Sequence, residues 1–441
     1  MVSVTNAQGD RDPAGIFRQA VETGRPVLLV FSGSDWCLPC IRLQKMILHD
    51  SGFTRYAEQH LLLLIADFPQ QKKLTERQVQ WNGELAAEFN PEGIFPRLLL
   101  LKPDRSIVTL PDWEHYSPTL FIRQLQNAIQ QAGMTKEYSR QEKLMGSAFE
   151  FIIEAAGDET GRQLLDACVN EVRRIEQKLT EFDEGSETAL INRMAGMEPV
   201  TVSGETYALL QRCHDISVLT GGAFDISAGV LKKLYRFKKE STGLPDPASI
   251  RKQLSLAGYK KIKLLPGNRV LLEKPGMHIG FGAIGKGYAA DKVRALMQQQ
   301  GVPSGVINAS GDLTAWGNRK DGQPWKTGIA HPAEPGTIIG WLHLGNRAIA
   351  TSGDYEQFFM VNGTRYSHTI DPVTGYPARG ISSVTVISPA AELSDALATA
   401  VSIKGVRRGL DMINQLPETH CIIVDDQDRV FYSKNIDFHA A

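Results

Sequence analysis

The stretch Tyr366–Thr399 constrains the fold of this 441-residue chain more than any other segment. Residues 371–377 are rich in proline and glycine, which fix tight turns. Ser383–Ile387 alternates and is mostly β-branched, which predicts a strand. Ser394 and Asp395 then predict the cap of a helix rich in alanine and leucine. The stretch therefore predicts turns, a strand and a helix start in a fixed order.

Asp395 and Thr399 are four residues apart, so helical geometry places both side chains on one face. Two oxygen ligands at a helix start, one of them anionic, suit a hard cation such as Mg²⁺. The alternative is that Asp395 only favours a helix N-terminus and that Thr399 only packs in the core. The spacing alone leaves both interpretations open.

The composition is that of a soluble globular protein, with 42% hydrophobic and 22% charged residues. A formal net charge of -1 argues against a nucleic-acid scaffold or a polybasic membrane binder. No segment approaches the ~20 apolar residues that span a bilayer, so we expect no transmembrane segment. The first residues show no signal peptide. We therefore expect a cytoplasmic protein, or a periplasmic one if an export signal has been removed.

The length predicts two or three domains, and the first begins with the apolar strand Val27–Phe31. This strand leads into the sequence Trp-Cys-Leu-Pro-Cys and a helical pattern. A thiolate at a helix N-terminus is stabilised by the unpaired N–H groups there, so Cys37 should be the attacking sulfur. Cys40 would resolve the mixed disulfide. A zinc site would need a second closely spaced Cys or His pair, which the sequence lacks.

The first domain also contains two further predicted strands, Leu61–Ala66 and Arg97–Leu101, and a closing helix, Ser117–Gln131. Together with the Trp-Cys-x-Pro-Cys sequence they resemble the thioredoxin fold, in which Pro96 matches a cis-proline facing the dithiol. The resemblance implies an α/β thioredoxin-like domain over residues 1–132. Polar residues 133–143 predict a linker to a second domain, residues 144–441.

The glycine-rich segment Gly280–Asp291 contains the pattern G-x-G-x-x-G, which also occurs in Rossmann folds. A Rossmann unit needs a strand directly before the glycines, and Pro275-Gly276 interrupts the preceding strand. The glycines can still let the backbone approach a diphosphate, with a helix start donating N–H groups. Lys286 would contact phosphates as a point charge.

Several motifs together resemble the FAD:protein FMN transferase family, the ApbE-like flavin transferases. They include His-x-x-Asp-Pro-x-Thr-Gly from His368, Asp-Ala-x-Ala-Thr from Asp395, Gly-Gly-x-Phe-Asp from Gly221, and the glycine-rich segment. The resemblance implies cofactor contacts at Met145, Phe182, Ser186, Ala223, Phe224, Asp225, Gly280 and Lys286. It implies metal ligands at Asp395, Thr399 and the backbone carbonyl of Ala283.

The chain departs from the family pattern at three positions. Gly280 stands where the family usually has an aspartate that contacts the adenosine part of FAD. Ala398 stands where many members have a further acid, and Phe182 where they often have tyrosine. With fewer protein oxygens, the cation would keep more water or phosphate oxygens, as Mg²⁺ tolerates.

The resemblance implies an α+β, T-fold-like second domain that transfers FMN from FAD to a Thr or Ser hydroxyl of an acceptor flavoprotein, with Mg²⁺ bound and AMP released. His368 is the candidate base, and its alternative role is a structural histidine bonded to a turn carbonyl. Two other functions stay open: hydrolysis of FAD to FMN and AMP, or a thiol–disulfide protein with a non-catalytic flavin-binding domain. The chain lacks the family's acceptor motif, so we expect a separate acceptor, and a thiol or disulfide partner protein for the dithiol.

Overall fold

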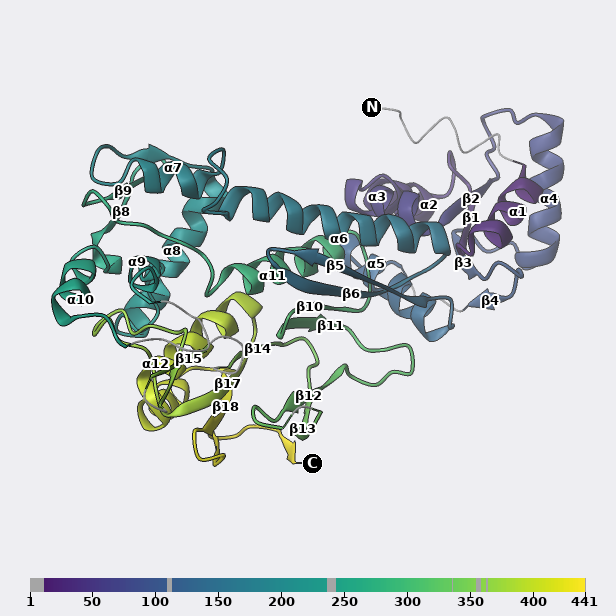
Figure 1. Cartoon of the computed structure of the whole chain (residues 1–441). Coiled ribbons are helices and arrows are strands. Elements are labelled where there is room, and N and C mark those ends of the chain that lie inside the picture. Colours follow the sequence, from purple (N-terminus) through teal and green to yellow (C-terminus); the bar gives the residue numbers. More distant parts are fainter. Residues whose placement is uncertain are drawn as a thin grey trace.

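The computed structural model describes residues 12–108, 113–235, 243–334, 336–353, 358–361 and 364–440 (Figure 1). The sequence segments Leu231–Phe237 and Ala350–Glu356 each resemble a further motif of the ApbE-like flavin transferases, but their residues 236–237 and 354–356 lie outside the described residues.

The N-terminal domain alternates helices and strands. Its elements are α1 Pro13–Thr23, β1 Val27–Ser32, α2 Leu38–Leu43, η1 Gln44–Leu48, α3 Ser51–His60, β2 Leu62–Asp67, α4 Glu76–Phe89, β3 Arg97–Leu101, β4 Ile107–Val108 and α5 Pro118–Gln131. Among the described residues, four strands form one sheet in the order β2-β1-β3-β4. Strand β1 pairs parallel with β2 and antiparallel with β3.

Every residue of strand β1 is buried, and its side chains point alternately to the two faces of the sheet. Leu28 and Val30 pack with residues of α3 and α5. Leu29 and Phe31 pack on the other face with residues of α1 and α4. Helices therefore cover both faces, and the apolar run Val27–Phe31 of β1 follows from that burial.

The strands and the closing helix of this domain were predicted nearly to the residue. Ser117 caps α5 through its side chain, with Pro118 at the first helical position. The peptide bond before Pro96 is cis. Within the long segment after β2, Thr75 and Gln78 form a capping box that begins helix α4.

The C-terminal domain is larger and mixes helices with antiparallel strands. Its elements are β5 Lys136–Leu144, β6 Ser147–Ala155, α6 Asp158–Leu179, α7 Glu187–Arg193, β7 Val200–Thr201, α8 Gly204–Leu219, α9 Gly229–Lys232, α10 Pro247–Leu254, η2 Tyr259–Lys261, β8 Ile262–Leu265, β9 Arg269–Leu272, α11 Gly285–Gln299, β10 Gly305–Ala309, β11 Asp312–Trp316, β12 Lys326–Ala330, β13 Ile338–His343, β14 Ala348–Gly353, β15 Phe358–Val361, β16 Thr364–Ser367, β17 Ile381–Ser388, α12 Ala391–Ile413, β18 His420–Asp425, β19 Val430–Tyr432 and β20 His439–Ala440.

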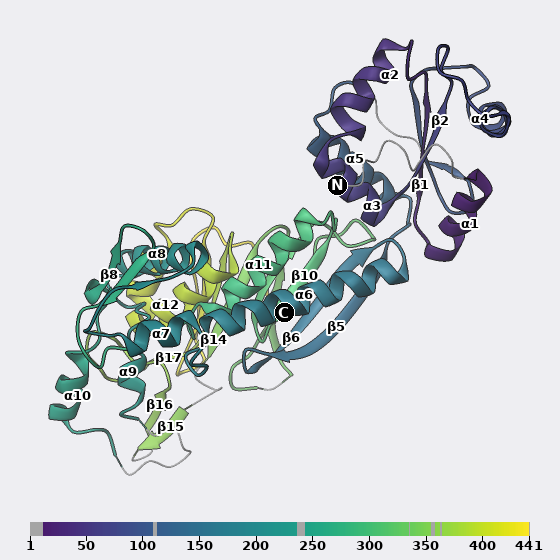
Figure 2. The same cartoon turned by 90° about the horizontal axis from the view of Figure 1, so that it is seen from above.

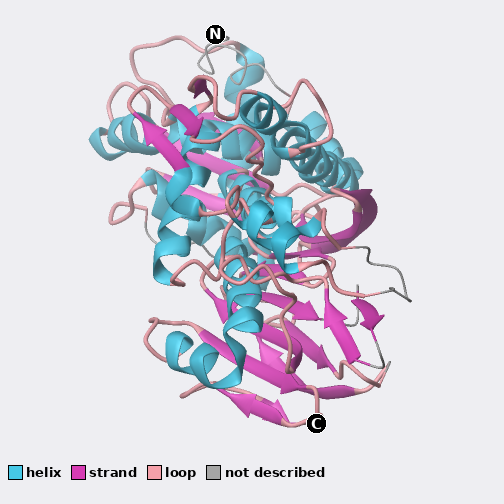
Figure 3. Ribbon diagram, turned by 60° about the vertical axis from the view of Figure 1, so that its left-hand side comes forward, coloured by secondary structure: helices cyan, strands magenta, loops and turns pink. Residues whose placement is uncertain are grey.

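Among the described residues, eight strands form the main sheet in the order β19-β18-β17-β14-β11-β10-β6-β5. Every neighbouring pair in it is antiparallel. Figure 3 shows the strands of the molecule in magenta and its helices in cyan. Helices α6, α11 and α12 pack against its strands, and the small sheet β12-β13-β20 contributes to a separate apolar cluster. The antiparallel order is incompatible with a Rossmann unit, as the sequence indicated.

The predicted linker is wrong in one respect, because residues 136–143 belong to strand β5, which pairs with β6 along its whole length. The strand lies at the sheet edge and is polar on its exposed face, so it shows no apolar pattern. Its buried face packs on α6 so closely that a Cβ added at Gly161 would lie 2.6 Å from the Tyr138 ring.

The start of helix α12 also differs from the prediction. The helix begins at Ala391, so Ser394 and Asp395 lie inside it and are buried. Asp291 of α11 accepts a hydrogen bond from the Glu392 N–H at 2.9 Å. A carboxylate from another helix thus accepts a hydrogen bond from an N–H group of the first turn. The predicted capping role of Ser394 and Asp395 is therefore wrong.

The two domains meet at a seam of polar contacts and of apolar contacts such as that of Ala156 with the cluster between α3 and α5. His60 bonds the Gln300 carbonyl, and Gln126 Nε2 donates to the Gly301 carbonyl at 2.8 Å. Burial lowers the pKa of His60 to about 4, so its imidazole is neutral at pH 7. Figure 2 shows the N-terminal domain at one end of the molecule and hairpin β15–β16 toward the other. In the described part of the chain, no helix has the length and apolar character to cross a membrane.

Candidate active site

A cavity of about 240 Å³ opens in the C-terminal domain, where segments far apart in the sequence meet. Its walls come from the loop after α8, the loop before α11, strands β11 and β14, the loop after β16, and α12. Most of the predicted site residues line it: Ala223, Phe224, Asp225, Gly280, Ala283, Lys286, His368, Asp395 and Thr399.

Asp395 and Thr399 lie one turn apart on α12, as predicted, and both reach the cavity. Asp395 is only 8% exposed, and its Oδ2 has no hydrogen-bond partner among the described residues. Burial and the neighbouring Asp312 carboxyl raise the pKa of Asp395 well above its usual range. The Gly287 N–H bonds this carboxyl, so the open position is at Oδ2 alone, and a buried carboxylate oxygen without a donor is a place where a cation would be stabilised.

Asp312 was not predicted as a site residue. It opens strand β11, is 2% exposed, and its Oδ2 lies 2.7 Å from Lys286 Nζ. The one available signal was its position in the segment Asn308–Asp312, where an acid follows a glycine turn. The result is two buried carboxyl groups and one ammonium group at the same wall of the cavity.

The oxygen atoms here fit a hard cation better than a soft one. Carboxylates of Asp312 and Asp395, the Thr399 hydroxyl and the Ala283 carbonyl are the oxygen ligands that Mg²⁺ accepts. Within the described ranges, no group of three or more His, Cys, Asp or Glu residues could hold a metal. Any cation at this wall would therefore depend on hydroxyl, backbone, water or substrate oxygens as well.

Hydrogen bonds to the Asp225 carboxylate hold the loop after α8 against neighbouring backbone. Its carboxylate accepts from the Ser227 N–H at 2.8 Å, the Ser227 hydroxyl at 2.6 Å and the Tyr259 N–H at 2.7 Å. Burial raises the pKa of Asp225. The Gly280 N–H donates to the Ile226 carbonyl at 2.9 Å, which joins this loop to the glycine-rich segment. Asp225 thus shapes the cavity wall.

His368 follows hairpin β15–β16 and is half-buried at the cavity. The turn behind it is fixed, because Tyr235 donates to the Gly375 carbonyl at 2.6 Å. Asp371 accepts from the Thr374 hydroxyl at 2.8 Å. Hydroxyl groups of Thr351 and Ser352 on β14 also line the cavity, and neither was predicted.

Three predicted cofactor residues do not line the cavity. Phe182 is 89% exposed. Ser186 is buried, and its hydroxyl donates to the Thr180 carbonyl at 2.5 Å and caps α7 through the Ala189 N–H at 2.9 Å. Met145 sits in the turn between β5 and β6, with its methyl group beside Gly285 at the start of α11. Their contacts with a cofactor stay predictions.

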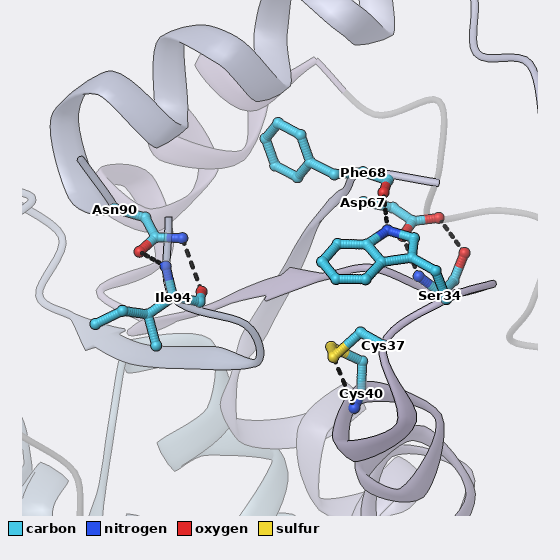
Figure 4. Close-up of a disulfide and its surroundings, with 8 residues drawn as sticks. Ser34, Cys37, Cys40, Asp67, Phe68, Asn90 and Ile94 are labelled. Atoms are coloured by element: carbon cyan, nitrogen blue, oxygen red, sulfur yellow. Dashed lines mark hydrogen bonds between the residues drawn. A yellow bond between two sulfur atoms is a disulfide. The ribbon is translucent and has the colours of Figure 1, made fainter. Parts of the chain in front are cut away.

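The dithiol lies in the other domain, and Cys37 and Cys40 form a disulfide (Figure 4). Cys37 is the N-cap of α2, and its sulfur accepts from the Cys40 N–H at 3.2 Å. Two loops are tied together above it. Ser34 Oγ donates to Asp67 at 2.6 Å, and Trp36 Nε1 donates to the Phe68 carbonyl at 2.7 Å. These bonds fix the backbone that presents Cys37.

Two family models match the chain. The one described as the ApbE family covers residues 145–423, and the one described as thioredoxin-like covers residues 12–103. A protein of Klebsiella pneumoniae named FAD:protein FMN transferase is 35% identical over 60% of this chain and 81% of its own length. One of the same name from Treponema pallidum is 28% identical over 68% of this chain and 88% of its own.

Solved structures agree with these matches. The crystal structure of the ApbE protein from Thermotoga maritima superposes with a TM-score of 0.62 and 32% identity, covering 68% of this chain and 97% of that one. The apo flavinyl transferase ApbE of Pseudomonas stutzeri gives a TM-score of 0.61 and 25% identity, over 68% of this chain and 95% of that one.

Proposed function

This chain belongs to the ApbE family, and we propose that it transfers FMN from FAD to a Thr or Ser hydroxyl of an acceptor protein and releases AMP. The observation that carries the proposal is the convergence of Lys286, His368, Asp395 and Thr399 on one cavity of the family domain. These side chains suit a substrate with a charged diphosphate between two neutral halves.

The start of helix α11 is suited to hold the diphosphate. Helix N-termini offer free N–H groups and a partial positive charge to phosphate. Lys286, in the first turn, adds a full charge, while Asp312 fixes its ammonium group at 2.7 Å. The diphosphate would therefore lie between α11 and α12, with its bridging oxygen close to this wall.

Asp395, Thr399 and the Ala283 carbonyl are the proposed Mg²⁺ ligands, and Asp312 lies beside them. When bound, Mg²⁺ would neutralise charge that develops on the diphosphate oxygens. Asp395 and Asp312 are two buried like charges, and a cation offsets their repulsion.

His368 is the proposed base. It takes the proton of the acceptor hydroxyl as that oxygen forms a bond to the phosphorus on the flavin side of FAD. The bond from this phosphorus to the bridging oxygen breaks, and AMP leaves with the electron pair. The products are a flavin phosphoester on the acceptor, AMP and one proton, which His368 passes to solvent.

The N-terminal domain is proposed as a thiol–disulfide redox module. Cys37 and Cys40 already form a disulfide at a helix start, and Cys37 is the cap residue whose thiolate the helix stabilises. Reduction by a partner thiol would release both sulfurs without changing the loop that Asp67 and Ser34 hold.

The test is to incubate the protein with FAD, Mg²⁺ and an acceptor protein that carries a threonine in the family's acceptor motif. We expect the acceptor to gain the mass of FMN less water, with one AMP per transfer. AMP and free FMN without a mass gain would identify FAD hydrolysis. Intact FAD with every divalent metal tried would overturn the proposed function.

A further inference from the structure

One carboxylate at the cavity has no part in the proposed transfer of FMN. Glu181 lies between α6 and α7 and lines the cavity, with its side chain 33% exposed. His278 Nε2 bonds Glu181 Oε2 and holds it there. No described residue donates a hydrogen bond to the other oxygen, Oε1. A fixed carboxylate with an open acceptor is suited to bind a donor group of a ligand.

The segment that carries His278 is itself fixed. Asn192 of α7 donates to the Ile279 carbonyl at 2.9 Å and accepts from the Ile279 N–H at 2.7 Å. The hydrogen bond from His278 lowers the pKa of Glu181, and Lys232 and Lys233 add to the effect. Glu181 is therefore ionised at neutral pH and is held in one orientation before any substrate binds.

Gly280 leaves space in front of this carboxylate. A Cβ added at Gly280 would meet Glu181 Oε2 at 3.4 Å, so any side chain here would lie against the carboxylate. With glycine, the carboxylate faces the cavity instead. Position 280 is also where the family resemblance places an aspartate that contacts adenosine. An acid from a different segment thus occupies nearly the same place.

We propose that Glu181, positioned by His278 and uncovered by Gly280, accepts a hydrogen bond from the adenosine half of FAD. This inference rests on the proposed function. An anion cannot face the diphosphate, which belongs at Lys286, so it must face an uncharged donor. Adenosine offers two kinds of donor, the ribose hydroxyls and the adenine amine. Glu181 is then a specificity residue that does not touch the reacting phosphorus.

The first test compares FAD binding to wild type and Glu181→Gln by flavin fluorescence. Glutamine still accepts from His278 but lacks the charge, so binding should weaken about tenfold or more. KM for FAD should rise with it, while kcat changes little. Glu184→Gln is the matched control, because Glu184 is an exposed acid three residues away. It should bind FAD as wild type does.

Two FAD analogues identify the donor, one with hypoxanthine in place of adenine and one with a 2′,3′-dideoxyribose on the adenosine side. Wild type should bind one of them more weakly than FAD, and Glu181→Gln should not discriminate. Discrimination by Glu181→Gln equal to that of wild type would overturn the proposal. The proposal would also be overturned if Glu181→Gln lost as much affinity for free FMN as for FAD, because Glu181 would then contact the flavin half.

The second test moves the acid. Gly280→Asp should weaken FAD binding in wild type, since two carboxylates would then lie together. In the Glu181→Gln background the same change should restore binding. If Gly280→Asp changed FAD affinity in the same direction in wild type and in Glu181→Gln, the proposal would be overturned. A wild type that binds no FAD at all would instead contradict the proposed function, which keeps the two failures distinct.

Discussion

The dithiol and the cavity of the C-terminal domain are built in opposite ways. Cys37 and Cys40 are three residues apart on one loop and helix, so a single local conformation brings both sulfurs together. The cavity takes its polar groups from positions as far apart as Glu181 and Thr399. A local site needs only its own helix start, whereas a dispersed site needs the whole domain to be folded.

This difference has a consequence for how the two chemistries are linked. The two domains meet at the seam that includes His60 and Gln126, and Figures 1 and 2 both show α2 far from hairpin β15–β16. Among the described residues that line the cavity of the C-terminal domain, there is no cysteine. We therefore expect the two activities to be separable.

The largest effect should come from Asp395 in the dispersed site. Asp395→Ala should reduce FMN transfer to background, and so should the isosteric Asp395→Asn. Because each change removes one of two neighbouring buried carboxyl groups, the melting temperature at pH 7 should not fall for Asp395→Asn. Transfer assays with Mg²⁺ and thermal melts check both points. Wild-type transfer by either variant would refute the metal assignment.

A change at the dithiol should remove its own activity and leave FMN transfer unchanged. Cys37→Ser should eliminate disulfide reductase activity, while FMN transfer to a cysteine-free acceptor stays at the wild-type rate. In reduced wild type, Cys37 should also be alkylated before Cys40 at neutral pH. The assay measures transfer by both proteins under oxidising and reducing conditions. If wild-type transfer changes with redox state and the variant's does not, the domains are coupled and our expectation is wrong.

His368 should have a smaller but still large effect on transfer. His368→Asn should bind FAD normally and lose about two orders of magnitude in kcat, because general base catalysis contributes roughly 10²–10⁴-fold. Fluorescence titration with FAD and single-turnover transfer separate binding from chemistry. Unchanged turnover would assign His368 the structural role of bonding a turn carbonyl.

The smallest effect concerns the seam between the two regions. Burial lowers the pKa of His60 from 6.5 to about 4. Below pH 6.5 the unfolded chain binds a proton that the folded chain does not. Stability should therefore fall as the pH drops toward 4, by about 3 kcal/mol at most. His60→Gln keeps a donor for the Gln300 carbonyl but should lack this pH dependence. Parallel slopes of unfolding free energy against pH would contradict the assignment.

The sequence by itself determined the elements whose signals are local. The apolar run of β1, the Ser117–Pro118 start of α5 and the dithiol at a helix start each depend on neighbouring residues, so their positions agree with prediction. The spacing of Asp395 and Thr399 also sufficed to place both on one helical face. The motifs that begin at His368 and Asp395 indicate the family from the sequence alone.

Only the tertiary structure decided the groups that depend on distant partners. Polar β5 is a strand because β6 pairs with it, and α12 begins early because Asp291 of another helix satisfies its first turn. Asp312 lies beside Asp395, and Glu181 lies beside Gly280, although each pair is far apart in the sequence. Such contacts leave no local signal, because their energy comes from burial and charge between segments that meet only after folding.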